Sequence, residues 1–396
     1  MGYLCSNPWT TAFVWGDGSV THCCYSNIGP LGNINRTPLA EIWHGKKIGY
    51  VRGKILAGRY TDAGCEYFCR VFRWNEYYGG MRDKPSIPEG LGRIEDFSAA
   101  AKPALPSILG IAIDAKCNLK CTHCLSSNDA PGISDKNLED LWPAVRSSKI
   151  VRLVNGEFSI NRRALDILRG ISSIEIPPRV FLNTNGTVDP NVYLDAAGTL
   201  PSFHLKFSLE GMGAAYEKVR VGAKWELFLK HLHSASESFR LKQAEGRDWK
   251  LYLNFCVMRS NFEAIPQILE FAIERNLPLV LNTLNGMRHI DENMFMYAHL
   301  APGNESVERV RGGCERLPGR RNYFFAEEFG SHLEYIFRVL ADKKLDVPYS
   351  KLKRIIERNP GRTADRKLTL LYKWKFDKKG FFLYIFRKLR KRLFNR

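Results

Sequence analysis

Three closely spaced cysteines, Cys117, Cys121 and Cys124, constrain this chain more than any other feature of its sequence. They lie in the segment Cys-Asn-Leu-Lys-Cys-Thr-His-Cys, directly after an apolar, strand-like run over residues 108–114. At this chain's cysteine frequency, the spacing would arise by chance with a probability of about one per cent. Three thiolates on one short loop can hold three corners of a four-iron cluster and leave the fourth iron open to a small molecule. The alternative is a structural zinc site completed by His123 or another cysteine.

The cellular compartment decides how the ten cysteines of the sequence are interpreted. The N-terminus lacks a basic segment followed by an apolar stretch, so we expect no secretory signal and a cytosolic location. The longest apolar run near the C-terminus, residues 381–386, is far shorter than the roughly 20 residues of a membrane-spanning helix. Because cytosolic thiols stay reduced, the cysteines indicate metal binding or catalysis rather than disulfides.

Strand-like runs alternate with helical patterns between residues 107 and 300. The runs cover residues 108–114, 150–154, 180–186, 204–210 and 251–258, and the helical patterns cover 137–148, 161–170, 225–239 and 262–276. This order is typical of an α/β fold in which helices cover a parallel sheet. Six such units would form a partial, TIM-like (β/α)6 barrel, with ligands at the carboxyl ends of the strands. Gly156 and Gly186 fall at such ends, where they allow close approach.

Several strands are predicted to carry polar residues on one face, because successive side chains of a strand point to opposite sides. A shared face is predicted for Lys206 with Ser208 and Glu210, for Asn183 with Asn185, and for Asn254 with Cys256. Three polar residues on one strand face favour a wet barrel interior. Each of them is expected either to contact a ligand or to be a hydrogen-bonded part of the barrel lining.

Together these segments resemble the radical S-adenosylmethionine (SAM) superfamily, whose members reductively cleave SAM to a 5′-deoxyadenosyl radical. The cysteine loop is similar to the CxxxCxxC loop of that family. Asn155-Gly-Glu157 resembles its Gly-Gly-Glu motif, with Asn155 in place of the first glycine and Phe158 where proline is usual. The segment 204–211 is similar to its Ser-x-Asp-Gly ribose strand, with Glu210 in the aspartate position, and the segment 216–220 resembles the arginine segment that often follows.

The resemblance implies a 4Fe-4S cluster on Cys117, Cys121 and Cys124 whose open iron binds SAM. It also implies that Glu157 holds the methionine amino group and that Arg220 meets the carboxylate of SAM. An electron donor such as flavodoxin or ferredoxin is implied as a partner. The implied SAM-binding residues are His123, Gly156, Glu157, Asn185, Ser208, Glu210 and Arg220.

A second cysteine group precedes the predicted barrel. Cys5, a spacer and Gly18-x4-Cys23 resemble the opening of the auxiliary-cluster domain called SPASM, or of its shorter twitch form, and Asp17-Gly18 predicts a hairpin turn. The resemblance extends to Leu31-Gly-Asn33, Glu41-Ile-Trp43 and Arg52. It implies one auxiliary 4Fe-4S cluster, for which structural zinc is the alternative. Its ligands would be Cys5, Cys23, Cys65 and Cys69, whereas Cys24 is expected to be a buried spectator and Cys314 is isolated.

The expected organisation places this auxiliary domain before the barrel, whereas in the family it usually follows it. We expect the auxiliary domain at residues 1–78, a linker at 79–106, the radical SAM core at 107–300, a helical extension at 301–365 and a basic tail at 366–396.

The excess of basic residues is concentrated in that tail. The chain has 59 Lys and Arg against 41 Asp and Glu, a formal net charge of +18. Residues 366–396 hold twelve basic residues and one acidic residue, a net +11, which leaves +7 for the first 365. Phe382, Phe386, Leu389 and Leu393 form one helical stripe among cations, which predicts an amphipathic helix that docks on an anionic membrane surface. The alternatives are a tail that packs on the core or stays solvated, and one that binds nucleic acid.

The resemblance implies either oxidation, with the auxiliary cluster accepting the second electron, or epimerisation, with a thiol returning a hydrogen atom. The implied substrates are sugars, aminocyclitols or ribosomally made peptides, and a docking tail would suit a cell-envelope saccharide. Cys256, predicted to face the barrel interior, is the candidate hydrogen-atom donor, and a buried core cysteine is its alternative. The alternative functions are a radical SAM RNA-modifying enzyme, disfavoured because no RNA-binding motif is appended, and a non-catalytic, membrane-tethered cluster or zinc scaffold.

Overall fold

The computed structural model describes residues 3–23, 28–60, 62–65, 91–93, 96–97, 105–124, 132–284, 286, 288–319, 333–341, 344–359, 362–376 and 382. Cys24, Cys69 and nearly all of residues 377–396 lie outside this part of the chain.

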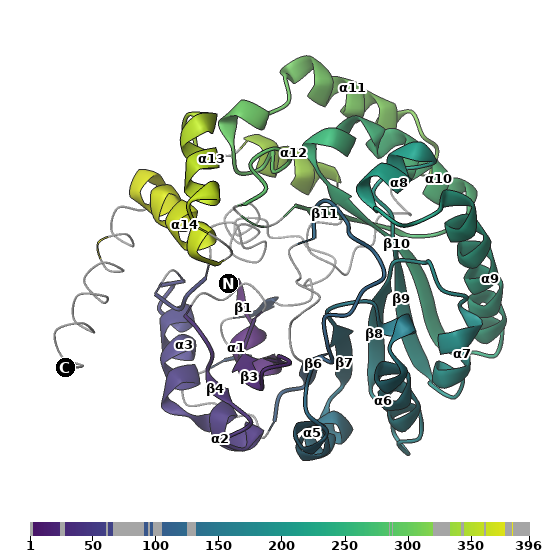
Figure 1. Ribbon diagram of the computed structural model, residues 1–396. Helices are drawn as coiled ribbons and strands as arrows, with labels where there is room; N and C mark the ends of the chain where they lie inside the picture. Colours follow the sequence, from purple (N-terminus) through teal and green to yellow (C-terminus); the bar gives the residue numbers. More distant parts are fainter. Residues whose placement is uncertain are drawn as a thin grey trace.

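A nine-stranded sheet with the order β11-β10-β9-β8-β7-β6-β2-β3-β4 organises the molecule (Figure 1). From β6 to β11, neighbouring strands are parallel and follow one another in the chain. This order confirms the predicted α/β fold with a parallel sheet. The strands are β2 (Thr11–Val14), β3 (Ser19–Thr21), β4 (Gly32–Asn33), β6 (Ile108–Ala112), β7 (Ile150–Val154), β8 (Arg179–Thr184), β9 (Ser202–Ser208), β10 (Asp248–Val257) and β11 (Leu279–Thr283).

Helices connect the parallel strands and lie along the outer side of the curved sheet (Figure 1). The four predicted helices are present with ends shifted by a few residues, whereas α7 and α8 were not predicted. The helices that follow Ser134 and Asn161 begin at side-chain caps. Ser134 accepts a hydrogen bond from the Asn137 amide, and Asn161 accepts from backbone amides in the first turn of its helix. The connecting helices are α5 (Asp135–Ser147), η2 (Phe158–Ile160), α6 (Arg162–Ser172), α7 (Asn191–Ala197), α8 (Ala214–Val219), α9 (Trp225–Ala244), η3 (Arg259–Ala264) and α10 (Ile265–Glu274).

Strand β9 shows how the alternating pattern positions the core. Phe203 and Phe207 are fully buried and pack against α9, with ring centroids 5.7 Å from Phe239 and 5.8 Å from Phe228 respectively. Burying each such side chain stabilises the fold by roughly 1.5–3 kcal/mol. The polar residues between them therefore lie on the opposite, inner face of the sheet, as the sequence pattern predicts.

The N-terminal segment is built into the same sheet. Strand β2 pairs in parallel with β6, and the hairpin β2–β3 continues the sheet outward to β4. Gly110 of β6 allows this pairing, because a Cβ atom there would lie 2.2 Å from the ring of Phe13. Strand β1 (Tyr3–Cys5) forms a separate antiparallel pair with β5 (Leu91–Arg93), which lies within the expected linker. The helices of this segment are α1 (Asn7–Thr10), α2 (Leu39–His44) and α3 (Lys46–Leu56).

Helices follow β11 to the end of the described chain. Leu368 and Tyr372 of the last one are buried, so the first part of the predicted basic tail packs against the protein. No helix of the described residues is both long enough and apolar enough to cross a membrane. These elements are η4 (Ala298–Leu300), α11 (Asn304–Glu315), α12 (Leu333–Ala341), α13 (Tyr349–Glu357) and α14 (Arg362–Phe376).

Candidate functional site

The three-cysteine loop lies at the carboxyl edge of the parallel sheet, immediately after β6. Backbone hydrogen bonds fix it to the segment after α8, because the amides of Lys120 and Thr122 donate to the carbonyls of Val221 and Val219 at 3.0 and 2.9 Å. On its other side, the Glu157 amide donates to the Lys116 carbonyl at 2.8 Å. The end of α8 on one side and the turn after β7 on the other therefore hold the loop in place.

The turn after β7 brings its backbone against the cysteine loop. Asn155 and Gly156 adopt positive φ angles of 74° and 61°. Asparagine tolerates this left-handed conformation, which explains how it replaces glycine in the motif. A Cβ atom on Gly156 would lie 2.5 Å from the Lys116 carbonyl oxygen, so this position requires glycine.

Glu157 is buried beneath the loop, and its carboxylate joins β7 to β8. The Oε1 atom accepts from the Ser159 hydroxyl at 2.6 Å and from the Thr184 hydroxyl at 3.0 Å, and Oε2 accepts from the Asn185 amide at 2.6 Å. Burial raises the pKa of Glu157, and these hydrogen bonds oppose the rise. This carboxylate is thus largely occupied in holding the carboxyl ends of two strands together.

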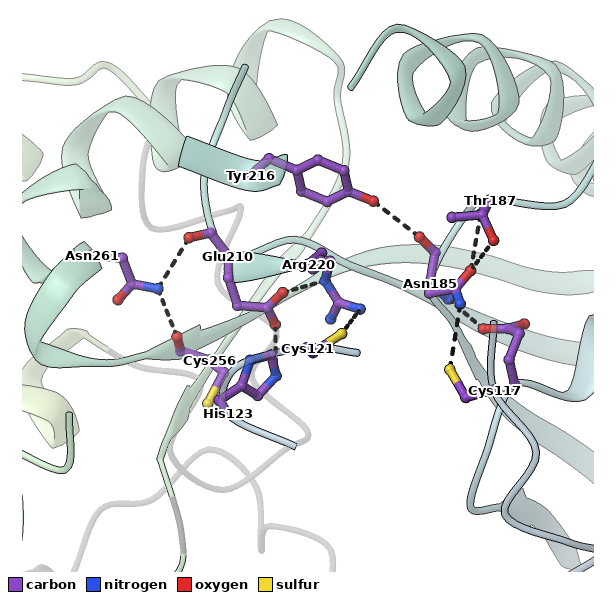
Figure 2. Close-up of polar contacts among 11 residues, drawn as sticks. Cys117, Cys121, His123, Asn185, Thr187, Glu210, Tyr216, Arg220, Cys256 and Asn261 are labelled. Atoms are coloured by element: carbon purple, nitrogen blue, oxygen red, sulfur yellow. Dashed lines mark hydrogen bonds and ion pairs between the residues drawn. The ribbon is translucent and has the colours of Figure 1, made fainter. Parts of the chain in front are cut away.

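Asn185 connects β8 to the first cysteine (Figure 2). Its side-chain amide donates to Asn118 Oδ1 at 2.9 Å and lies 3.8 Å from the Cys117 sulfur. Its Oδ1 atom accepts from the Thr187 hydroxyl at 2.6 Å, and its backbone carbonyl accepts from the Tyr216 hydroxyl at 3.1 Å. Asn185 therefore supports the cysteine loop and leaves little capacity for a further ligand.

Arg220 connects the second cysteine to the end of β9. Its Nε donates to Glu210 in an ion pair whose side chains are 7% and 1% exposed, and its Nη1 lies 3.8 Å from the Cys121 sulfur (Figure 2). Burial lowers the pKa of Arg220, but the Glu210 carboxylate outweighs that effect and raises it overall. The other Glu210 oxygen lies 3.9 Å from His123 Nε2. A permanent cation thus faces the cysteine loop.

The thiols of this loop lie close enough to influence one another's ionisation. The pKa of Cys121 is raised to about 11, chiefly by burial; Arg220 opposes the rise, and charge on Glu210, Cys117 or Cys124 adds to it. Burial likewise raises the pKa of Cys117 and lowers that of His123. A metal would therefore have to displace protons from these thiols.

The loop offers three thiols as ligands for a four-iron cluster. No group of three His, Cys, Asp or Glu side chains among the described residues converges on one ion. A four-iron cluster instead binds each thiolate to a different iron, so its cysteines stand farther apart than the ligands of one ion. Cys117 and Cys121 are half-buried and Cys124 is exposed, which leaves the loop open on one side.

The remaining predicted site residues lie near the same edge. Ser208 is buried at the carboxyl end of β9. Cys256 lies at the carboxyl end of β10, half-buried against Val219, Met258 and Leu284. The structure thus brings the predicted SAM-binding residues and Cys256 to one edge of the sheet.

Sequence reasoning missed several residues that organise this edge. Asn261 donates from one Nδ2 atom to the carbonyls of Glu210 and Cys256, at 3.1 and 3.0 Å, and so joins the ends of β9 and β10 (Figure 2). His289 follows β11 and lies within electrostatic range of His123. The sequence signal that could identify His289 is its position after a strand, but the apolar pattern did not predict β11. Also missed were Asn118, Thr187 and Tyr216.

Two cysteines of the N-terminal group, Cys5 and Cys23, lie toward the opposite edge of the sheet. Because β3 runs antiparallel to β2, the chain leaves β3 toward the amino ends of the parallel strands, and Cys23 follows two residues later. Cys5 ends β1 shortly before β2 begins at that same edge. Cys5 is buried, and Cys23 and Cys65 are half-buried. The fourth predicted ligand, Cys69, lies outside the described residues.

A family comparison identifies this N-terminal region. Residues 5–70 match SPASM, an iron-sulfur cluster-binding domain. The match confirms the predicted SPASM-type region and spans all four cysteines proposed as its ligands. The segment is therefore a domain of the iron-sulfur class, which disfavours the zinc alternative.

Solved structures provide a second comparison. SuiB from Streptococcus suis bound to S-adenosylmethionine has a TM-score of 0.38 and 16% identity, over 46% of this chain and 41% of SuiB. SuiB bound to its precursor peptide SuiA has a TM-score of 0.39 and 15% identity, over 46% and 40%. Native anSMEcpe with bound AdoMet and Cp18Cys peptide has a TM-score of 0.33 and 17% identity, over 45% and 50%. The matched region thus spans half or less of each of these chains. No curated protein sequence matches the chain significantly.

Proposed function

We propose that this protein is a radical SAM enzyme whose sheet from β6 to β11 is the partial (β/α)6 barrel of that class. The observation that carries the proposal is the position of Arg220, which joins Cys121 of the three-cysteine loop to Glu210 at the end of β9. A loop of three thiols with a buried cation beside it suits an iron-sulfur cluster and the carboxylate of a ligand bound to its open iron.

In this proposal the 4Fe-4S cluster on Cys117, Cys121 and Cys124 supplies the electron that cleaves SAM. Arg220 would attract the carboxylate of SAM, and Glu210, already paired with Arg220, would keep the guanidinium oriented. His123 would pack beside the adenine. Further SAM contacts would come from Gly156 and Ser208.

Glu157 and Asn185 would act mainly by position. The Glu157 carboxylate holds the Asn185 amide, and the Asn185 side chain holds Asn118 beside Cys117. Loss of either link would let the cysteine loop shift relative to β8, and misplaced cluster ligands would weaken metal binding.

The inner face of the sheet favours a polar substrate. Asn254 and Asn282 are hydrogen-bonded to each other across β10 and β11, and both are half-buried. Side-chain amides both donate and accept, as recognition of hydroxyl-rich or peptide groups requires. We therefore propose a sugar, cyclitol or peptide-type substrate that undergoes oxidation or epimerisation.

The SPASM-type domain would complete the electron path in the oxidative reaction. Its Cys5 and Cys23 lie toward the amino edge of the sheet and the three-cysteine loop lies at the carboxyl edge. A substrate held between the two edges would have an electron acceptor on the side opposite the radical source.

Anaerobic purification and SAM turnover test the proposal. We expect brown protein with about eight irons per chain and formation of 5′-deoxyadenosine on addition of SAM and a reductant. Combined replacement of Cys117, Cys121 and Cys124 by alanine should remove about half of the iron and all SAM cleavage. Cys65→Ala is the matched control and should spare SAM cleavage while it removes the other half. SAM cleavage by the triple variant would contradict the catalytic assignment, and colourless zinc protein would favour the scaffold.

A further inference from the structure

Arg52 is an unusual buried cation in the SPASM-type domain. It lies on α3, its side chain is almost entirely enclosed, and the residue is 2% exposed. Its Nε donates to the Pro8 carbonyl at 2.9 Å, and its guanidinium carbon lies 4.9 Å from the centre of the Trp43 ring. These contacts orient the guanidinium but neutralise none of its charge.

No carboxylate among the described residues pairs with Arg52, and its Nη2 atom is buried without a hydrogen-bond partner. A charged group buried without a counterion destabilises the fold, and an unsatisfied buried donor adds to that cost. Natural proteins therefore retain such a cation where an anion completes the site.

A second buried polar atom without a partner lies nearby. His22 is 2% exposed, its Nδ1 atom is buried without a partner, and it lies within electrostatic range of Arg52. His22 directly precedes Cys23, and the carbonyl that Arg52 binds belongs to Pro8, three residues after Cys5. Both unsatisfied groups therefore border the chain segments that carry two of the proposed auxiliary ligands.

We propose that Arg52 and His22 donate hydrogen bonds from Nη2 and Nδ1 to the sulfur atoms of the auxiliary cluster and thereby raise its reduction potential. A thiolate-bound iron-sulfur cluster carries net negative charge, which supplies the missing counterion for Arg52. Reduction adds one more negative charge, so a fixed cation and hydrogen bonds to sulfur stabilise the reduced state preferentially. The auxiliary cluster would then accept an electron more readily. This proposal rests on the iron-sulfur assignment of residues 5–70 and does not depend on SAM cleavage.

The test isolates the auxiliary cluster in the full-length chain. The triple variant at Cys117, Cys121 and Cys124 serves as background, so that one cluster gives the entire signal. Arg52→Gln and Arg52→Lys are introduced into it, with Lys46→Gln as the matched control, since Lys46 is an exposed cation on the same helix. The measurements are iron content, thermal unfolding, and the potential at which the reduced-cluster signal appears in an electron paramagnetic resonance titration.

We expect Arg52→Gln to keep its iron and its cooperative unfolding while the reduction equilibrium shifts roughly tenfold toward the oxidised cluster, about 59 mV for one electron. Arg52→Lys keeps the charge and loses Nη2, so it should shift the potential by less, and Lys46→Gln should leave it unchanged. The proposal is overturned if both Arg52 variants keep the parental potential, if Lys46→Gln shifts it equally, or if both Arg52 variants unfold. Colourless zinc protein would also overturn it. If the wild-type protein contains the auxiliary cluster but does not cleave SAM, the proposed function is refuted and this proposal still stands.

Discussion

Arg220 and Glu210 form an ion pair that is almost completely removed from solvent, with side chains 7% and 1% exposed. The pair joins the segment after α8 to the end of β9, and the same guanidinium reaches the Cys121 sulfur at 3.8 Å. The stability of the carboxyl edge and the position of the cysteine loop therefore depend on one contact.

Glu210→Gln should destabilise the folded protein by about 3–5 kcal/mol, because it leaves the Arg220 charge buried without its counterion. The measurement is the free energy of unfolding in urea. Asp166→Asn is the matched control, since it breaks an exposed pair with Arg169 and should cost less than about 1 kcal/mol. The double variant Glu210→Gln/Arg220→Met should be more stable than Glu210→Gln alone. Equal losses for Glu210→Gln and Asp166→Asn would contradict the importance of this pair.

Gly156→Ala should displace the cysteine loop. The positive φ angle costs an alanine roughly 1–2 kcal/mol, and its Cβ atom would also overlap the Lys116 carbonyl. Gly246→Ala provides the control, because Gly246 has a φ angle of 81° and a Cβ atom there would meet no other atom within 4 Å. We expect both variants to lose stability, but only Gly156→Ala to lose iron from the first cluster. Parental iron content in Gly156→Ala would show that the loop does not need this close approach.

The strand order and the edge at which the site lies were predictable, because short apolar runs with period-two alternation alternate with helical patterns. The supporting hydrogen bonds were not predictable. Asn185 was expected to bind SAM, yet its side chain holds Asn118 and Thr187. The contact with Asn118 joins residues 67 positions apart in the chain, and no local pattern encodes it. The pairing of β2 with β6 was missed for the same reason, since it joins two strands from distant parts of the chain.

Acid should destabilise the protein through His204, which is fully buried on the inner face of β9. Burial lowers its pKa to about 4 from 6.5, although the nearby Asp248 carboxylate opposes this. The folded state therefore binds fewer protons than the unfolded state between these values, and stability falls as the pH falls through that window. His204 should contribute about 2 kcal/mol of the loss between pH 7 and pH 5.

The measurement is the free energy of unfolding in urea at both pH values. His204→Gln should reduce the loss by that amount, whereas His233→Gln, at an exposed histidine of α9, should leave it at the parental value. An equal pH dependence in His204→Gln and the parent would exclude His204 as its source.

Removal of residues 377–396 tests the proposed membrane docking without cutting α14, whose Leu368 and Tyr372 are buried. We expect the truncated protein to stay folded and to lose sedimentation with anionic vesicles, because most of the cationic stripe would be absent. Formation of 5′-deoxyadenosine should be unchanged. Unaltered sedimentation would eliminate the docking role, and loss of salt-sensitive RNA binding would favour the RNA-modifying alternative.

Cys256 allows the two proposed reaction classes to be separated. It lies at the carboxyl end of β10, and Asn261 ties its carbonyl to that of Glu210 at the end of β9. In the proposed epimerisation, a thiol at this edge would return a hydrogen atom to the substrate radical, and its S–H hydrogen exchanges with solvent. Packing against Val219, Met258 and Leu284 would equally suit a structural cysteine.

Turnover in heavy water distinguishes these roles. If the enzyme is an epimerase that uses Cys256, the wild type should incorporate deuterium into its product, and Cys256→Ser should still consume SAM without incorporating any. If the enzyme is a dehydrogenase, the wild type should incorporate none and the variant should turn over at nearly the parental rate, since the auxiliary cluster rather than a thiol accepts the electron of the substrate radical. Cys314→Ser is the matched control for cysteine loss, because Cys314 is buried in α11, after the parallel strands end. Undiminished deuterium incorporation by Cys256→Ser would remove this thiol from the mechanism and direct the search for the donor to another group at the same edge.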